Sequence, residues 1–309
     1  MTVANKLWTE FYRPKTIDDY VFTNNQVKEQ VKSWIKQKTI PHLLLYGPAG
    51  TGKTTLAKIL VNQLDIDPYD FLQVNASRDN GVDFLKNKIE GFISTIPFGD
   101  LKVVLLDEAD YLSPPAQGIL RGLLETYAST ARFILTCNLH NKIISPLKSR
   151  CHELRIDKTD QTEFTTRVAK ILLTENINFE LDILDTYVKS TYPDLRKCLN
   201  LVQTSSVSGT LETVQEITTT IDYKLVMVDL FKQKKYKQAR QLLCSQVRPE
   251  EMEEFYTWAY NNLDLWSETE EGQDAAILVI KKGMIDHSMA ADPEINLAAT
   301  LVMLSEIDK

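Results

Sequence analysis

One glycine-rich segment constrains this chain more than any other feature of its sequence. Residues 47–54 read Gly-Pro-Ala-Gly-Thr-Gly-Lys-Thr, which fits the pattern G-x-x-x-x-G-K-[ST]. A short apolar run at 42–46 precedes the segment, and apolar residues at helical spacing follow it through residues 53–64. Glycines let backbone N–H groups turn inward around phosphate oxygens, and the following helix directs the positive end of its dipole at them. The segment therefore predicts a strand, a phosphate-binding loop and a helix.

Two side chains of this loop carry distinct chemistry. Lys53 can reach the outer phosphates of a bound nucleotide, and the hydroxyl of Thr54 can ligate Mg²⁺. The predicted nucleotide-binding residues of the loop and of the first helical turn are Gly47, Gly50, Thr51, Gly52, Lys53, Thr54 and Thr55.

A second segment, residues 103–110, reads Val-Val-Leu-Leu-Asp-Glu-Ala-Asp. Its four apolar residues place Asp107 at the carboxyl end of a buried strand, where ligands of parallel sheets bind. Asp107 is a candidate Mg²⁺ ligand, and Glu108 is a candidate for polarising the water that attacks the γ-phosphate. Two adjacent acids after a strand are also compatible with a solvated loop. The phosphate-binding loop about 50 residues upstream favours the catalytic interpretation.

Strand and helix patterns alternate through the first half of the chain. Strands are expected at 42–46, 71–74, 102–106, 132–136 and 152–156, and helices at 53–64, 82–93 and 114–127. Such alternation with continuous apolar strands predicts a parallel sheet covered by helices on both faces. After about residue 157 helical spacing dominates. We therefore expect an α/β domain at 1–156, a helical domain at 157–220 and a second helical domain at 221–309, whose last helix opens at Asp292-Pro293.

The distribution of charge matters more than the net charge of −7. Residues 246–309 contain 14 acidic and 4 basic side chains, a net charge of −10, whereas residues 1–245 contain 28 acidic and 31 basic ones, a net charge of +3. The first 245 residues can therefore present a basic surface to nucleic acid.

Composition narrows the cellular setting. No apolar run approaches the roughly 18–20 residues of a membrane helix, and residues 1–12 lack the apolar core of a secretory signal. The four cysteines, Cys137, Cys151, Cys198 and Cys244, are scattered along the chain, which suits a reducing compartment. We expect a cytoplasmic protein with no membrane partner.

Phosphoryl transfer also needs groups that stabilise charge and orient water. Asn138 follows a predicted strand and is a candidate for orienting the attacking water. Arg150 follows a helix expected to begin near Asn141, and Arg196 opens a helix of the second domain. Each arginine by itself is compatible with a surface ion pair. The order of these candidates along the chain favours a role in phosphoryl transfer.

That order resembles the AAA+ ATPases and, within them, the sliding-clamp loaders. The resemblance spans residues 7–201 and includes the segment Phe-Tyr-Arg-Pro-Lys-Thr-Ile-Asp-Asp at 11–19, which is similar to the opening box of replication factor C small subunits and phage clamp-loader ATPase subunits. It implies an α/β P-loop AAA+ module with a parallel sheet and helices on both faces, followed by a helical lid and an all-helical collar that mediates oligomerisation. It also implies ATP and Mg²⁺ as cofactors.

The resemblance assigns further residues to the nucleotide site. Glu108, Asn138 and Arg196 fall at the Walker B glutamate, sensor 1 and sensor 2 positions. Ser149-Arg150-Cys151 matches the motif whose arginine reaches into the ATP of a neighbouring subunit. The residues matched to the adenine pocket are Thr9, Glu10, Phe11, Tyr12 and Val21.

Three residues are matched to contacts with DNA. Gln117 and Arg121 lie in a helix that the family uses to couple DNA contact to the ATP site. Lys86 falls where relatives carry a phosphate-contacting arginine, in a segment at 75–87 that lies beside the DNA. Asn80 of the same segment replaces a basic residue common in cellular relatives.

Taken together, the resemblance implies ATP-dependent loading of a ring-shaped polymerase clamp onto primer-template DNA, with ATP hydrolysis stimulated by DNA and clamp. The implied partners are copies of the chain in a ring or spiral, a second and smaller loader subunit, the sliding clamp and primed DNA. The collar at 221–309 is short, which favours a phage protein acting in the host cytoplasm.

Rival interpretations stay open at this stage. Another AAA+ DNA-remodelling ATPase, such as a branch-migration helicase or a replication initiator, is expected to carry a dedicated DNA-binding fold, for which residues 246–309 are too acidic. A scaffold without hydrolysis conflicts with the intact Lys53, Asp107, Glu108 and Arg150. A DEAD-box helicase needs a second helicase-type domain, which the helical remainder does not resemble.

Overall fold

The computed structural model describes residues 6–78, 81–206, 208–213, 223–247 and 251–307. The chain forms two compact units, Met1–Asp160 and Gln161–Lys309. The predicted domain boundary after residue 156 is close to this division and stays a prediction. The predicted boundary after residue 220 lies outside the described residues.

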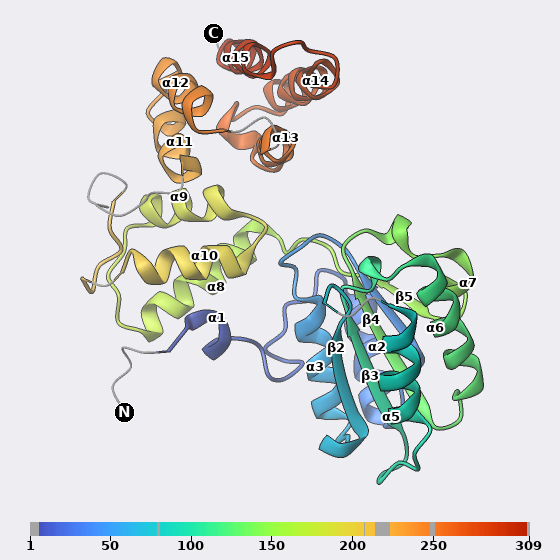
Figure 1. The fold of residues 1–309 in the computed structure, drawn as a ribbon. Coiled ribbons are helices and arrows are strands. Elements are labelled where there is room, and N and C mark those ends of the chain that lie inside the picture. The colour runs from blue at the N-terminus through green and yellow to red at the C-terminus, as the bar shows by residue number, and fades with distance from the viewer. Residues whose placement is uncertain (1–5, 79–80, 207, 214–222, 248–250, 308–309) are drawn as a thin grey trace. The chain divides into compact units, whose positions relative to one another are not determined.

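The first unit is built on a five-stranded parallel sheet with the strand order β2-β3-β4-β1-β5 (Figure 1). The strands are β1 (Leu43–Tyr46), β2 (Phe71–Asn75), β3 (Lys102–Asp107), β4 (Ala131–Cys137) and β5 (His152–Arg155). The expected α/β architecture is therefore confirmed. The three strands that carry the predicted site, β1, β3 and β4, are neighbours or next neighbours in the sheet, and their carboxyl ends meet at one edge.

Side chains of each central strand alternate between two hydrophobic cores. Val104 and Leu106 of β3 face one core, and Val103 and Leu105 face the other, as the two-residue repeat of a strand requires. The second core is covered by α2 (Asn25–Gln37) and α3 (Lys53–Gln63). The first is covered by α4 (Val82–Phe84), η3 (Leu85–Glu90), α5 (Gly91–Ile93), α6 (Pro114–Thr126) and α7 (Ser145–Lys148). The sheet is thus a rigid platform buried on both faces.

The helix expected at 82–93 is not a regular α-helix, because its middle, η3, winds in wider π-helical turns. Leu85, Ile89 and Ile93 are buried at intervals of four residues. On a regular α-helix a four-residue interval rotates the stripe by about 40° per step. All three side chains lie in the same core, and a regular α-helix also tolerates this spacing.

The helix expected to begin near Asn141 was also placed too early. The chain makes a 3-10 turn, η5 (His140–Lys142), and the short helix α7 begins only at Ser145. Pro146 explains the difference, because a proline lacks the N–H that a helix running on from Asn141 would need and clashes with the preceding turn. The proline instead sits in the first turn of α7.

The second unit is helical in its described residues, apart from one isolated bridge between Asn178 and Thr210. Its first three helices are α8 (Gln161–Thr174), α9 (Leu181–Thr191) and α10 (Leu195–Thr204). They are followed by α11 (Tyr223–Lys232), α12 (Tyr236–Gln246), α13 (Met252–Asn261), α14 (Glu270–His287) and α15 (Pro293–Leu304). As predicted, Asp292 caps the last helix, with its side chain accepting from the N–H of Glu294 at 2.9 Å.

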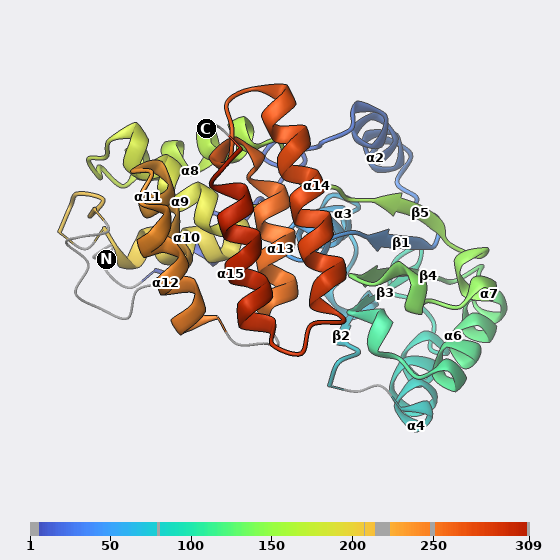
Figure 2. The ribbon, with the colours of Figure 1, turned by 90° about the horizontal axis from the view of Figure 1, so that it is seen from above.

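Helices α11 to α15 share one core of aromatic and aliphatic side chains. α15 lies between α12 and α14 and contacts both (Figure 2). The indole N–H of Trp258 on α13 donates to the carbonyl of Lys189 on α9 at 2.7 Å, which joins this core to the preceding helices. No helix among the described residues is both long and apolar enough to cross a membrane.

Candidate active site

The loop after β1 has a backbone that only glycine tolerates at two positions. Gly47 has φ 150°, and a Cβ there would lie 2.1 Å from the carbonyl oxygen of Ile156. Gly52 has φ 90°, and a Cβ there would lie 3.2 Å from the ring of Tyr20. The loop is therefore closed against β5 on one side and Tyr20 on the other, and larger residues at 47 and 52 would open it.

Lys53 is the first residue of α3 and is only 7% exposed. Its Nζ donates to the carbonyl oxygens of Gly47 at 2.9 Å and Pro48 at 2.6 Å. Burial lowers the pKa of Lys53, while Cys137, Asp110 and Asp107 act in the opposite direction. The ammonium group is thus held inside the curl of the loop.

The first turn of α3 supplies backbone donors to the same place. Its N-cap, Gly52, has no side chain to satisfy the free N–H groups that begin a helix. Those groups and the positive end of the helix dipole face the loop next to Lys53. Gly50, Thr51, Thr54 and Thr55 complete the segment, and the Thr51 hydroxyl donates to the carbonyl of Pro48 at 3.0 Å. The arrangement is an anion site with both fixed and charged donors.

The structure brings Thr54 and Asp107 together across 53 residues of sequence. The Thr54 hydroxyl donates to Oδ1 of Asp107 at 2.7 Å, and Asp107 is the last residue of β3. A hydroxyl and a carboxylate oxygen at this spacing are the donors that Mg²⁺ prefers, with its other positions left to phosphate and water. The residues present therefore fit the predicted metal.

Thr136 was missed in the sequence and proves central to the site. It is 2% exposed on β4, its hydroxyl donates to Oδ1 of Asp107, and the same hydroxyl accepts from the N–H of Glu108 at 3.1 Å. Glu108 has the left-handed backbone φ 58° and ψ 44°, which is unusual for a residue other than glycine. Thr136 therefore fixes both acids. Its signal in the sequence was a lone hydroxyl in the otherwise apolar run 133–137.

Asp110 is a second residue whose role the sequence did not reveal. It is 6% exposed, and its Oδ2 accepts from the N–H groups of Leu139 at 3.0 Å and Asn138 at 3.3 Å. Its Oδ1 has no hydrogen-bond partner among the described residues. Asp110 thereby ties the turn after β3 to the turn after β4. It places Asn138, whose side chain is exposed, at the edge that also carries Lys53.

Gln117 lies buried on α6, at 1% exposure. Its amide nitrogen donates to the carbonyls of Leu112 at 3.1 Å and Lys142 at 3.0 Å, and its amide oxygen accepts from the N–H of Ile144 at 2.9 Å. These bonds hold the segment that leads into α7, rather than Glu108. Arg121 lies one turn later on α6 and is exposed.

Arg150 is the second residue after the end of α7 and lies at the surface. Its Nη1 donates to the carbonyl of Pro146 at 2.8 Å, and its guanidinium group pairs with the carboxylate of Glu125 on α6. All of these partners belong to α6 and α7. Within one copy the structure does not link Arg150 to the loop at 47–54, which is consistent with the expectation that it serves a neighbour.

A small cavity adjoins the loop where an adenine base is expected. It is lined by Tyr20, Val21, Phe22, Thr23, Asn24, Val27, Arg155, Ile156 and Asp157. Val21 was among the predicted residues. The hydroxyl of Tyr20 donates to the carbonyl of Thr51 at 3.4 Å, which links the cavity to the phosphate-binding loop. Thr9, Glu10, Phe11 and Tyr12 form α1 (Trp8–Phe11) and its end, outside this lining.

The remaining predicted residues lie elsewhere. Arg196 belongs to the second unit, where it is exposed in the first turn of α10, and its N–H donates to the capping side chain of Asp194 at 3.0 Å. Lys86 is exposed on η3. Asn80 lies outside the described residues. The roles of Arg196 and Lys86 stay predictions.

The fold and the site define a P-loop nucleotide-binding protein of the AAA class. Residues 43–159 match the family described as ATPase family associated with various cellular activities (AAA). The replication factor C small subunit of Saccharolobus solfataricus is 40% identical over 249 residues, which cover 78% of this chain and 75% of that protein. The one from Sulfurisphaera tokodaii is 42% identical over 217 residues, 68% of this chain and 66% of that protein. The chain belongs to the replication factor C small-subunit family of AAA ATPases.

Solved structures show the same fold at greater distance. The Holliday junction branch migration motor RuvB of Thermotoga maritima superposes with a TM-score of 0.56 at 18% identity, covering 72% of this chain and 78% of that one. Likeness at this identity shows the fold alone. The sequence relatives do not favour the rival interpretation as a branch-migration helicase.

Proposed function

We propose that this chain is an ATPase subunit of a clamp loader, which uses ATP to load a ring-shaped polymerase clamp onto primer-template DNA during replication. The observation that carries the proposal is the 40% identity to a replication factor C small subunit across 78% of the chain. The intact constellation of Lys53, Thr54, Asp107 and Glu108 at one edge of the sheet supports it.

The nucleotide is proposed to be ATP, held at its phosphates by Lys53, by the N–H groups of the loop and by the first turn of α3. Lys53 now bonds to Gly47 and Pro48, so its ammonium group has to exchange those carbonyls for phosphate oxygens. Thr54 and Asp107 would hold Mg²⁺, which neutralises phosphate charge when bound. The cavity beside Val21 has a volume of only about 10 Å³, so it would have to widen to take the base.

Hydrolysis would rely on fixed positions for the groups that act on water. Glu108 accepts the proton of the attacking water in this proposal, and its backbone is held by Thr136. Asn138 would orient the same water, and Asp110 holds its backbone. These hydrogen bonds place both residues before substrate arrives, which is how a preorganised site lowers a barrier.

Charge on the transferred phosphate would be stabilised by Arg150 of the adjoining copy. In the single chain this guanidinium group pairs with Glu125. Both side chains are partly exposed, so the pair is weak and can exchange for a phosphate when copies assemble. Arg196 is proposed as the sensor of the bound nucleotide from the second unit.

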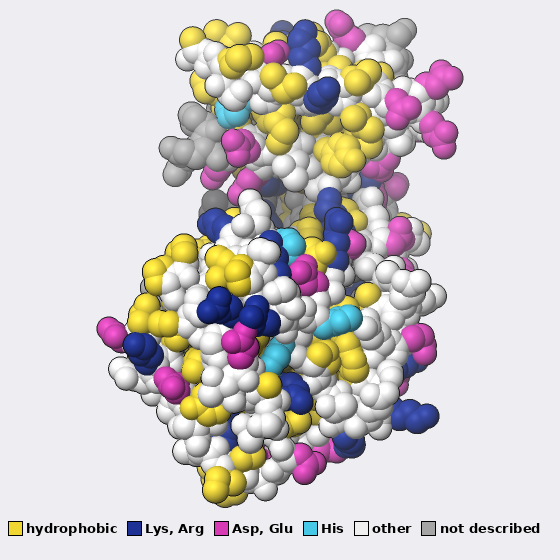
Figure 3. Space-filling view, turned by 90° about the vertical axis from the view of Figure 1, so that its right-hand side faces the viewer, with side chains coloured by type: hydrophobic (Ala, Val, Ile, Leu, Met, Phe, Trp, Pro, Cys, Tyr) yellow, Lys and Arg dark blue, Asp and Glu magenta, His cyan; other side chains and the backbone are white. Residues whose placement is uncertain are grey.

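The proposed partners are further copies in a ring or spiral, a smaller loader subunit, the clamp and primed DNA. The second unit offers a surface for such assembly, because hydrophobic side chains are exposed on its α14 face (Figure 3). Leu278, Ile285 and Met289 of this face are 67%, 49% and 75% exposed. Monomeric proteins rarely leave contiguous surfaces of this kind uncovered.

DNA is proposed to lie against Lys86 and Arg121 of the first unit and to stimulate hydrolysis. Gln117, one turn before Arg121, holds the segment 142–144 that leads to Arg150. A shift of α6 on DNA contact would therefore reach the chain that positions Arg150. Contacts of this kind are sequence-independent and salt-sensitive.

The test is a loading experiment with the chain and the proteins that copurify with it in a non-hydrolysable ATP analogue. Recovery of a ring-shaped clamp and a smaller subunit, followed by ATP-dependent transfer of the clamp to primed circular DNA, is the expected result. Recovery of strand-exchange or origin proteins with no clamp under any nucleotide would contradict the proposed clamp loading. The proposed ATPase activity would be unaffected by that result.

A further inference from the structure

The second unit carries a groove between α12 and α15, well away in sequence from every residue assigned above. The groove has a volume of about 530 Å³ and is lined by Lys234, Lys235, Tyr236, Lys237, Gln238, Arg240, Leu301, Val302 and Ser305. We call it the α12–α15 groove. No acidic side chain lines it, although residues 246–309 have a net charge of −10.

The four cations of the groove are not neutralised within the described chain. Lys234, Lys235, Lys237 and Arg240 have no hydrogen-bond or ion-pair partner for their side chains among the described residues. Residues 230–247 contain five basic side chains and no acid. The positive potential of the groove is therefore available to a ligand.

Other lysines of the same unit show that acids are at hand for pairing. Lys189 pairs with Asp264 at 2.6 Å and with Asp185 at 3.2 Å, and Lys232 pairs with Asp185 at 2.5 Å. Lys232, the fifth cation of the run, is thus ion-paired, whereas the four cations of the groove are not. An ordinary run of solvated lysines does not line a cavity. Here the unpaired cations line the α12–α15 groove.

The backbone at the groove has an unfavourable conformation in the unliganded chain, and its free N–H groups favour binding of an anion. Lys234 has the left-handed φ of 57°. Lys235 is the N-cap of α12 and forms no side-chain hydrogen bond to the first turn, so the free N–H groups of that turn keep their capacity. Lysines around the positive end of a helix dipole repel it. A phosphate group at this position would relieve the repulsion and accept from the free N–H groups.

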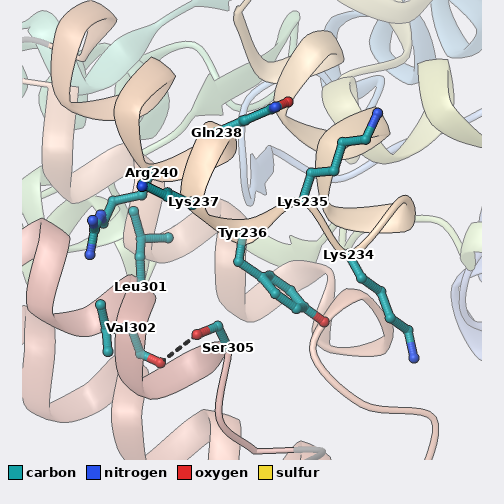
Figure 4. Close-up of a pocket in the computed structure, with 9 residues that line it drawn as sticks. All are labelled: Lys234, Lys235, Tyr236, Lys237, Gln238, Arg240, Leu301, Val302 and Ser305. Atoms are coloured by element: carbon teal, nitrogen blue, oxygen red, sulfur yellow. Dashed lines mark hydrogen bonds between the residues drawn. The ribbon is translucent and has the colours of Figure 1, made fainter.

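Tyr236 gives the groove an aromatic surface. Figure 4 shows its ring between Lys234 and Lys235 on one side and Lys237 and Arg240 on the other. The ring of Phe231 packs near it in a tilted arrangement, with ring centroids 6.1 Å apart. Val302 on α15 adds an apolar wall that is 37% exposed. Cations on both sides of an aromatic ring are the combination that single-stranded nucleic acids use, with phosphates on the cations and a base on the ring.

We propose that the α12–α15 groove binds single-stranded DNA through its phosphate backbone, with a base stacked on Tyr236. A duplex keeps its bases paired and leaves the ring and Val302 without a partner. An acidic protein segment would use the cations but neither the ring nor the free N–H groups of α12. The site goes beyond the proposed function, which places DNA contacts only at Lys86 and Arg121 of the first unit.

The first experiment measures binding of fluorescein-labelled oligo(dT) to the full chain without nucleotide, over a series of salt concentrations. The variant Lys235→Gln/Lys237→Gln is expected to bind about tenfold more weakly at low salt. The slope of log K against log salt should fall by about 1.4, because each phosphate contact on a single strand contributes roughly 0.7. Omitting nucleotide separates this result from the ATP-dependent contacts of the first unit.

The matched control is Lys281→Gln/Lys282→Gln, which removes two adjacent exposed lysines of α14 outside the groove. Affinity and salt slope should stay at the values of the unaltered chain. An equal loss in both double variants would show diffuse attraction and overturn the groove. Weaker self-association of the groove variant in sedimentation, with unchanged oligo(dT) binding, would overturn it as well and identify a contact between copies.

A second measurement locates the strand directly. Oligonucleotides that carry 5-iododeoxyuridine should form a photoadduct at Tyr236, which mass spectrometry of peptides identifies. Tyr236→Phe keeps the ring and should retain oligo(dT) affinity, whereas Tyr236→Ser should lose severalfold, in line with base stacking. Adducts confined to the first unit would contradict the proposal even if the salt slope changed.

Discussion

The edge of the sheet in the first unit and the α12–α15 groove in the second both present positive charge to an anion, and they do so in opposite ways. Lys53 is 7% exposed, bonded to two loop carbonyls and surrounded by backbone donors. The groove lysines 234, 235 and 237 are exposed and have no partner among the described residues. A buried, directed cation can select and act on one phosphate group. Exposed cations attract a polyanion of any sequence, and salt weakens this attraction.

Position in the fold, rather than residue type, therefore distinguishes a cation that can take part in a reaction from cations that only attract an anion. Asp107, Glu108 and Thr136 stand within hydrogen-bond reach of one another at the sheet edge, because parallel strands deliver their ends to one place. The groove has no carboxylate and no buried donor of this kind. Substitutions at the edge should therefore change nucleotide binding or turnover, and substitutions in the groove should change the affinity for single-stranded DNA.

The largest expected effect is on hydrolysis by the assembled chain. Arg150→Ala should lower the turnover of ATP by roughly 10³-fold or more while nucleotide affinity stays nearly unchanged, as for other arginines that act from a neighbouring subunit. Steady-state ATPase rates and binding of a fluorescent ATP analogue measure the two quantities. Glu125→Gln is the control, because it frees Arg150 from its ion pair without removing it and should leave turnover intact or higher. Equal losses of binding and rate in the Arg150 variant would make this arginine structural.

Removing the buried cation comes next. Lys53→Ala should weaken nucleotide binding about 10- to 100-fold, because a charge-assisted hydrogen bond contributes about 1.5–3 kcal/mol. Calorimetric titration with ATP in the presence of Mg²⁺ measures the loss. The groove variant Lys235→Gln/Lys237→Gln should titrate like the unaltered chain, and a comparable loss there would erase the distinction between the two regions.

A smaller effect is expected from the hydroxyl that fixes the two acids. Thr136→Val should reduce kcat about tenfold with little change in KM, since a hydrogen bond of about 1 kcal/mol is lost at Asp107 and at Glu108. Thr136→Ser keeps the hydroxyl and should restore most of the rate. If serine fails to rescue, the role of Thr136 is packing within β4 rather than positioning.

The last prediction concerns acid stability, and the effect should be larger in the first unit than in the second. Burial, and then the nearby guanidinium group of Arg132, lower the pKa of His42 from 6.5 to about 4. The folded state therefore favours neutral His42, whose Nδ1 accepts from the N–H of Phe133 at 3.2 Å. The stabilisation is complete above pH 6.5 and is lost as the pH falls towards 4, because the unfolded chain takes up the proton first.

Hydrogen exchange of the two units between pH 7 and 4.5, corrected for intrinsic rates, measures this difference. Protection of β1 and β4 should fall with pH while protection of α13 and α14 changes less. His42→Asn retains an acceptor near the Nδ1 position without titrating and should flatten the response of the first unit. An identical pH response in this variant would assign the acid sensitivity to other groups.

Most of the fold could be predicted because its signals are local. The five strands lie within a few residues of the apolar runs that predicted them, and the helix expected at 114–127 is α6, whose N-cap Ser113 accepts from the N–H of Ala116. One expected helix was placed too early and another is irregular. Pro146 forbids a helix running on from Asn141. The wider turns of η3 could not be predicted from Leu85, Ile89 and Ile93, because their spacing is also that of a regular α-helix.

The candidate active site was only partly visible in the sequence. Lys53, Thr54, Asp107 and Glu108 stand in short patterns whose spacing already implies their chemistry. Thr136 and Asp110 look like a strand hydroxyl and a loop acid, because their partners lie 28 or 29 residues away along the chain. The α12–α15 groove was hidden for the same reason, since its two walls are separated by more than 50 residues.

Nucleotide binding and the parallel α/β sheet could be predicted from local patterns, because a P-loop needs its glycines in one contiguous segment and buried strands need contiguous apolar runs. The polar side chains that position the residues of the site became visible only in the folded chain. The tertiary structure showed that Thr136 joins Asp107 to Glu108 and that Arg150 rests on Glu125. Hydrogen bonds and ion pairs between residues far apart in the sequence form only when packing brings strand ends and helix faces together. Local sequence patterns therefore do not predict them.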